Sequence, residues 1–156
     1  MDNRAHLWGI VAAAISGTAA IAVMEMYAAR GALPLMTIPF ATSIVLVMGS
    51  PEVEAAQPRP LVGGHLLAAL VGLVVVKLFG PGHWPAALAV GLTMVVMQLT
   101  RTFHPPAGID PLVIVVHDMS WDFFVIPVAV GALALAGFAF VWHNAVSRIA
   151  WPARWW

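Results

Sequence analysis

Apolar runs long enough to cross a lipid bilayer occupy most of this chain. They cover residues 7–29, 61–79, 85–100 and 121–142. A helix rises about 1.5 Å per residue, so roughly 20 apolar residues cross a hydrocarbon core of about 30 Å. With 62% hydrophobic and only 9% charged residues, the chain cannot present a charged, water-facing surface. These features predict an all-α integral membrane protein with four long transmembrane helices.

Two shorter apolar segments are interrupted by proline. They are residues 33–48, with a proline at Pro39, and residues 105–116, with a proline at Pro111. Proline has no N–H to donate and fits the first turn of a helix better than its middle. We therefore expect two shorter, Pro-broken membrane segments, with half-helices that begin near Pro39 and Pro111.

The order long, short, long occurs twice along the chain, which suggests a 3+3 inverted repeat within one domain, residues 1–156. Interrupted segments at matching places in two halves point to the midplane site of a transporter. If both short segments cross the bilayer, the halves are inverted; if both re-enter, the halves are parallel. In either case the distribution of Lys and Arg places both termini in the cytoplasm. We expect a multi-pass protein of the cell inner membrane.

Two of the long helices carry small residues at every fourth position, a spacing that lets another helix approach closely. The positions are Ala12, Ser16 and Ala20 in residues 7–29, and Gly64, Ala68 and Gly72 in residues 61–79. The alternative for the first set is a generic lipid-facing helix rich in alanine. Because six helices are few for enclosing a cavity, we also expect a homo-oligomer, most simply a dimer.

Several classes of function are disfavoured. The chain has no cysteine, which removes disulfides and thiolate chemistry, and its seven basic residues balance its seven acidic residues, which argues against a nucleic-acid partner. No His or carboxylate spacing matches a metal site, and no Gly-rich phosphate loop is present. We expect neither a cofactor nor a catalytic site, so the expected partners are the lipid bilayer and a small solute.

Residues 101–111 concentrate charge and helix-breaking residues within otherwise apolar sequence. The pair Pro105-Pro106 ends the preceding helix. Non-helical backbone inside a membrane is tolerated only where protein buries it or where it lines a water-filled cavity. We expect such a cavity here. Asp110 followed by Pro111 predicts an N-cap and a first helical residue.

The N-terminus of a half-helix carries partial positive charge, so a small anion can bind there. Arg101 and His104 are three residues apart, and we expect them on one side of the preceding helix end, adding charge and hydrogen-bond donors. Thr42 and Ser43 lie in the first turn of the other half-helix, beside its unpaired N–H groups. In the alternative interpretation Arg101 only meets headgroups or a carboxylate, and His104 only satisfies a backbone carbonyl.

His65 follows the small residue Gly64. A lone histidine at such a place commonly bonds a carbonyl of the neighbouring helix, and a role in binding is the second interpretation. Asp110 likewise has the simple role of an N-cap as its first interpretation.

Three separated blocks carry a resemblance to a known family. They read Pro39-Phe40-Ala41-Thr42-Ser43, Gln57-Pro58-Arg59-Pro60-Leu61-Val62-Gly63-Gly64-His65 and Thr100-Arg101-Thr102-Phe103-His104-Pro105-Pro106-Ala107-Gly108. They resemble the HPP family of small integral membrane proteins, over roughly residues 34–131. The resemblance implies a membrane protein usually described with four spans and, for some members, nitrite transport. The residues it marks are His104, Pro105, Pro106, Ala107 and Gly108, with Arg101, His65 and Ser43. Residues 109–111 differ from the small apolar residues expected after the motif.

These observations favour a membrane transporter or channel for a small inorganic anion, with nitrite first, and with a midplane site at the His-Pro-Pro break. The alternative is a membrane module that binds a ligand or partner without transporting it. A membrane-embedded enzyme that uses His104 and Asp110 as acid and base is the third and least supported hypothesis.

Overall fold

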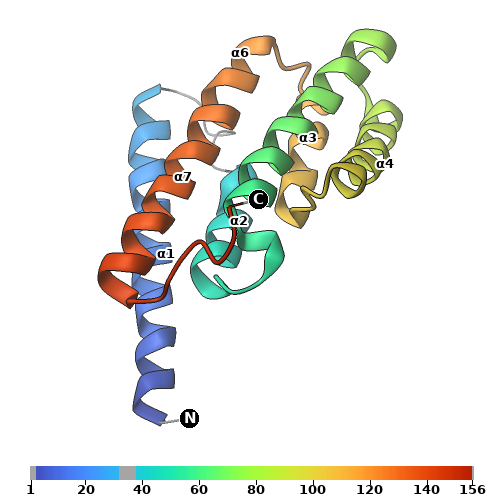
Figure 1. Cartoon of the computed structure of the whole chain (residues 1–156). Coiled ribbons are helices and arrows are strands. Elements are labelled where there is room, and N and C mark those ends of the chain that lie inside the picture. Colours follow the sequence, from blue (N-terminus) through green and yellow to red (C-terminus); the bar gives the residue numbers. More distant parts are fainter. Residues whose placement is uncertain (1–2, 32–37, 156) are drawn as a thin grey trace.

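A computed structural model describes residues 3–31 and 38–155, which form a bundle of helices without strands in those ranges (Figure 1). Four helical stretches are long and apolar enough to cross a membrane. They are α1 (Asn3–Gly31), α3 (Pro58–Phe79), α4 (His83–Thr100) and the stretch Trp121–Ser147. The last comprises α6 (Trp121–Phe123), the π-helical turns η4 (Phe124–Ala129) and η5 (Trp142–Ser147), and between them α7 (Val130–Val141).

Two shorter helical stretches complete the bundle and confirm the predicted fold class. The first is α2 (Ile38–Gly49), and the second joins the 3-10 turn η3 (Pro105–Gly108) to α5 (Ile109–Val116). A further 3-10 turn, η2 (Glu54–Ala56), precedes α3. The 12 residues of α2 span about 18 Å, less than a hydrocarbon core of about 30 Å. The start of the predicted segment 33–48, up to residue 37, lies outside the described residues.

The six membrane segments alternate in direction along the chain (Figure 1). On α3, Gly64 lies against His104 and, farther along, Gly72 lies against Pro111, so α3 and the second short segment run parallel. Each short segment runs opposite to the long helices that flank it in sequence. The first half therefore has directions opposite to those of the second half, as in the inverted arrangement.

The predicted small-residue positions are helix contacts. Ala12, Ser16 and Ala20 are buried on an α1 whose other faces are largely exposed, so a purely lipid-facing helix is the wrong interpretation for that side. On α3, a Cβ atom added to Gly64 would lie 2.7 Å from the Cβ of His104, and one added to Gly72 would lie 2.8 Å from the Cα of Pro111. Only glycine permits such an approach, so these two positions let residues 104–111 pack directly on α3.

The last span is interrupted, which the sequence analysis did not predict. Pro127 lies inside it, and Ile126 has non-helical angles, φ −130° and ψ 111°. A proline inside a helix removes a backbone donor and clashes with the carbonyl four residues before it, which accounts for the kink.

The C-terminal tail folds back onto the loop before α3. The side-chain Oε1 of Gln57 accepts hydrogen bonds from the backbone N–H of Ala153 at 2.8 Å and of Arg154 at 3.3 Å, and its Nε2 donates to the carbonyl of Pro51 at 2.7 Å. Trp151 is buried. Its ring packs in the hydrophobic core beside the ring of His143.

Candidate functional site

Four buried polar side chains from four different segments meet where the two short helical stretches come together. Ser43 belongs to α2, His65 to α3, His104 to the segment between α4 and η3, and Asp110 to the first turn of α5. Each is 0% exposed. We call these four residues the polar chain.

The polar chain is continuous. Asp110 Oδ2 lies 2.7 Å from His65 Nδ1, and His65 Nε2 lies 2.8 Å from Ser43 Oγ. Ser43 Oγ lies 2.9 Å from His104 Nε2, and His104 Nδ1 lies 2.7 Å from the carbonyl oxygen of Ala55. The chain therefore runs from a carboxyl group to a backbone carbonyl through two imidazoles and one hydroxyl.

The end of α4 turns the backbone so that His104 reaches the interior. The N–H of Arg101 bonds the carbonyl of Gln98 and the N–H of Thr102 bonds the carbonyl of Met97, which is a Schellman arrangement. Arg101 takes the left-handed conformation, φ 56°, that this motif requires. The following residues then run back over Gly64 into the bundle.

Arg101 does not face the polar chain. Its side chain is exposed and lines a hollow of about 310 Å³ with Glu54, Gln98 and Phe103. The expectation that Arg101 and His104 share one side of the helix end is wrong, because the left-handed residue separates their directions. Ala55 also lines this hollow, so the hollow adjoins the outer end of the polar chain.

Asp110 is not the N-cap of α5. The helix begins at Ile109 with Gly108 as its N-cap, and no side chain caps it. Asp110 lies in the first turn, where a carboxyl group suits the helix dipole, and it contacts His65. Its other oxygen, Oδ1, has no hydrogen-bond partner among the described residues. The N-terminus that was expected to receive an anion is thus already occupied by an acidic side chain.

The other predicted site residues lie around the polar chain. Thr42, Pro105 and Pro106 line an outer groove of about 580 Å³ between α2 and η3. Ala107 is buried in the core, and Gly108 caps α5. The expected water-filled cavity is wrong for the break itself, because its residues Thr102, His104 and Ala107 are buried by protein.

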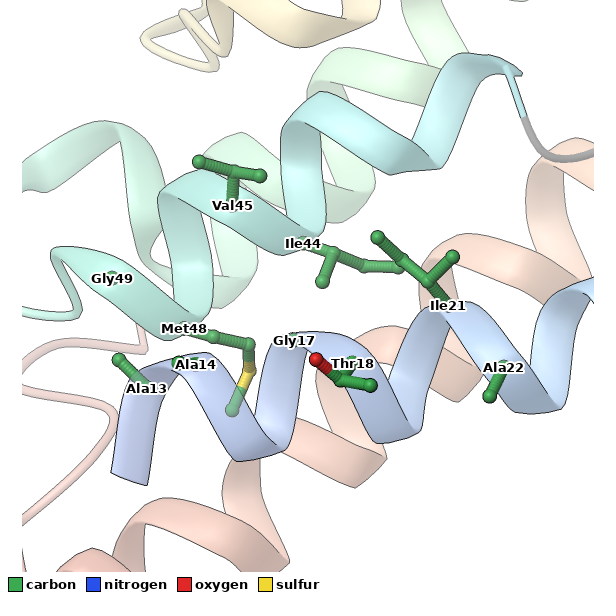
Figure 2. Close-up of a pocket in the computed structure, with 10 residues that line it drawn as sticks. All are labelled: Ala13, Ala14, Gly17, Thr18, Ile21, Ala22, Ile44, Val45, Met48 and Gly49. Carbon is green, nitrogen blue, oxygen red and sulfur yellow. The ribbon is translucent and has the colours of Figure 1, made fainter. Parts of the chain in front are cut away.

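A larger hollow of about 650 Å³ lies between α1 and α2 (Figure 2). Its lining is apolar except for Thr18. Such a surface offers no charge to recognise an ion and matches the hydrocarbon around a membrane protein.

The order Asp110, His65, Ser43 resembles the triad that activates a serine nucleophile. However, the carbonyl of Ala55 can only accept, so the Nδ1 of His104 donates to it. In a neutral His104 the Nε2 atom then carries no hydrogen, so it accepts a hydrogen bond from the hydroxyl of Ser43. The hydroxyl is also fully buried. The arrangement is therefore suited to holding and moving a proton rather than to attacking a substrate.

No cluster of three or more His, Asp or Glu side chains in residues 3–31 and 38–155 is placed to hold a metal ion. The two imidazole Nε2 atoms both point to the hydroxyl of Ser43, which occupies the place between them.

Two members of this site were not among the predicted binding residues. Asp110 is the one buried carboxyl group in the described part of the chain, and Ala55 contributes only a backbone carbonyl. A carboxyl group within apolar membrane sequence is by default a functional candidate, and that signal was present at Asp110. Nothing in the sequence marks the carbonyl of Ala55.

Comparisons with known proteins agree with the helical membrane architecture. Two proteins of Dictyostelium discoideum, each named only as a transmembrane protein, are 36% identical to this chain over 125 residues, which is 75% of the chain. The match covers 44% and 40% of those relatives, so the chain spans less than half of their length. No solved structure matches. The family described as "HPP, transmembrane region" matches residues 2–152, and the chain belongs to this family of multi-pass membrane proteins.

Proposed function

We propose that this protein is a membrane transporter or channel for a small inorganic anion, with nitrite as the first solute to test. The observation that carries the proposal is the polar chain, buried where two short helical stretches meet inside an otherwise apolar bundle. Ionisable groups inside a membrane protein are costly and mark solute or proton pathways. Paired short segments are also typical of transporter binding sites. The resemblance to HPP proteins implies nitrite for some members.

The hollow beside Arg101 is the place where the anion would first bind. Its guanidinium supplies positive charge, and Gln98 supplies amide donors. Glu54 lines the same hollow and offsets part of that charge, which favours a weakly held, exchangeable anion. From there the solute would pass Ala55 to reach the polar chain.

Nitrite uptake into proteoliposomes tests this function. Arg101→Gln should reduce the uptake above empty liposomes at least tenfold. Arg148→Gln is the matched control, because Arg148 is also exposed and also left-handed, φ 54°, but does not line the hollow. Equal uptake by the two variants would remove Arg101 from the pathway. Absence of uptake by the wild-type protein would overturn the nitrite assignment.

The proposal places the protein in the cell inner membrane with both termini in the cytoplasm. One end of the bundle carries three arginines: Arg101, Arg59 and Arg154. Arg59 bonds the carbonyl of Thr100, and the backbone N–H of Arg154 bonds Gln57. Basic residues gather on the cytoplasmic side of membrane proteins, which supports that orientation. The chain has no cysteine, so single cysteines introduced on either side, labelled with a membrane-impermeant reagent, test it.

A homodimer is part of the proposal, since the exposed apolar faces of α1 leave room for a second copy. Light scattering on the protein in detergent, corrected for bound detergent, measures the mass directly. A monomeric mass would overturn the dimer and leave the transport proposal unchanged.

The complete burial of the polar chain favours one alternative, a membrane module that binds a ligand without moving it. Saturable binding of nitrite without any uptake above empty liposomes would support this alternative. Catalysis is not part of the proposal.

A further inference from the structure

Building on the proposed transport function, we infer that the polar chain couples the anion to a proton, taking up one proton with each monovalent anion so that transport is electroneutral. Ser43 is the switch that lets the chain accept this proton.

Without an added proton, the hydrogen bonds around Ser43 have one arrangement. The Nδ1 of His104 carries a hydrogen, because its partner is the carbonyl of Ala55 at 2.7 Å. A neutral His104 then accepts the hydroxyl hydrogen of Ser43 at its Nε2. The hydroxyl has one hydrogen only, so the remaining contact of Ser43 requires His65 Nε2 to donate.

One proton then remains between His65 Nδ1 and Asp110 Oδ2, which are 2.7 Å apart. If His65 holds it, the pair is an imidazolium and a carboxylate. If Asp110 holds it, both groups are neutral. The net charge of the polar chain is zero in either case, which suits its complete burial.

The chain has room for one further proton. Ser43 Oγ also lies 3.3 Å from the carbonyl oxygen of Pro39. If the hydroxyl turns its hydrogen to Pro39, its oxygen can accept from His65 and from a protonated His104 at the same time. Every N–H in the chain then has an acceptor, and the net charge is +1.

A second added proton has no such place. It would put two hydrogens between His65 and Asp110, or leave one on Asp110 Oδ1, which has no partner among the described residues. An unpartnered buried donor loses its bonds to water without gaining a partner, which disfavours this state. The geometry therefore sets the capacity at one added proton.

The other charged and titratable groups near the site are held apart from this exchange. Arg101 and Glu54 line the hollow beyond Ala55, and Arg59 donates to a backbone carbonyl at the end of α4. His143 bonds a backbone carbonyl of α2 and does not contact the polar chain. A charge of +1 on the chain is thus balanced by an arriving monovalent anion, since a lone charge in a membrane interior is costly.

Proteoliposomes with an internal pH dye, assayed for nitrite at a clamped membrane potential, test the coupling. We expect about one proton per nitrite above empty liposomes and a rate that does not change with potential. Empty liposomes correct for nitrous acid that crosses the lipid alone. In His104→Gln the ratio of protons to nitrite should fall to near zero, whereas in His143→Gln it should stay near one.

Nitrogen-15 NMR of the histidine rings supplies a readout that does not depend on flux. At constant pH, nitrite should convert one ring from neutral to imidazolium in the wild type, and this signal should be missing in His104→Gln. Nitrite uptake without protons, or uptake that follows the membrane potential, would overturn the coupling and leave the transport proposal standing. No uptake at all, with no change in the rings, would overturn both.

Discussion

Two regions of the bundle bury histidines against α2, and they differ in what those histidines contact. In the polar chain, His65 and His104 meet the hydroxyl of Ser43, which can both donate and accept. His143 belongs to η5 and donates from Nε2 to the carbonyl of Val47 at 3.0 Å. Val47 lies one turn after Ser43 on α2. A carbonyl never changes its role, and the Nδ1 of His143 has no partner in the part of the chain that is described. Thus the first region can rearrange its hydrogens, and the second can only hold the helices together.

Removing the carboxyl group of Asp110 should have the largest effect and would sharpen this contrast. In Asp110→Ala, the imidazole of His65 remains buried without its partner at 2.7 Å. Breaking one side of a buried ion pair costs about 3–5 kcal/mol. Thermal unfolding in detergent, followed by circular dichroism, measures the loss. Asp122→Ala, at an exposed position, is the control and should be nearly neutral; equal losses would contradict the pairing.

Crowding the polar chain should have the next largest effect. In Gly64→Ala, the new Cβ would lie 2.7 Å from the Cβ of His104 and 2.9 Å from the carbonyl oxygen of Thr102. Overpacking of this kind costs about 1–3 kcal/mol. Gly137→Ala has nothing within 4 Å, so it should be neutral or stabilise its helix by about 0.5–1 kcal/mol. The two variants would be compared in the same unfolding assay, and a neutral Gly64→Ala would contradict the close contact between α3 and His104.

Releasing the tail should weaken the region around His143 before it affects the polar chain. Gln57→Ala removes the acceptor of two tail N–H groups and the donor to Pro51. We expect a loss of about 1–2 kcal/mol, as for a few hydrogen bonds. Hydrogen exchange should rise first at Ala153 and Arg154. Glu52→Ala, an exposed residue of the same loop, should leave that exchange unchanged.

The smallest effect is expected at His143 itself. His143→Leu loses the hydrogen bond to Val47 but also removes a ring nitrogen without a partner among the described residues. These changes partly offset each other, so the net loss should be about 0.5–1 kcal/mol. Nitrite uptake per folded protein should remain at the wild-type level. A fall in the ratio of protons to nitrite as large as that expected for His104→Gln would break the distinction between the two regions.

Much of the fold could be predicted from local patterns. The long helices follow from apolar runs of membrane length, and the contact faces follow from small residues such as Ser16 and Gly64 at helical spacing. The kink at Pro127 had a visible signal, since a proline inside a helix breaks its hydrogen bonds. It was not used.

The site was less accessible to sequence reasoning because its contacts are distant along the chain. Asp110 and His65 are 45 positions apart, and Ser43 and His104 are 61 apart. The direction of the Arg101 side chain follows from the left-handed backbone conformation of Arg101 itself. Residues other than glycine rarely adopt this conformation, so no local sequence pattern predicts it. His65, His104 and Ser43 were singled out, but their mutual contacts required the tertiary structure.

The hydrogen bonds between Gln57 and the C-terminal tail have a practical consequence for anyone handling this protein. Gln57 is two residues from Ala55, whose carbonyl ends the polar chain. An affinity tag or fluorescent fusion attached close after Arg154 would therefore disturb the hydrogen bonds of Gln57. It would thereby displace the loop whose Ala55 carbonyl orients the His104 ring. Attachment ahead of α1 is the safer engineering choice, because the N-terminal end of α1 lies away from that loop (Figure 1).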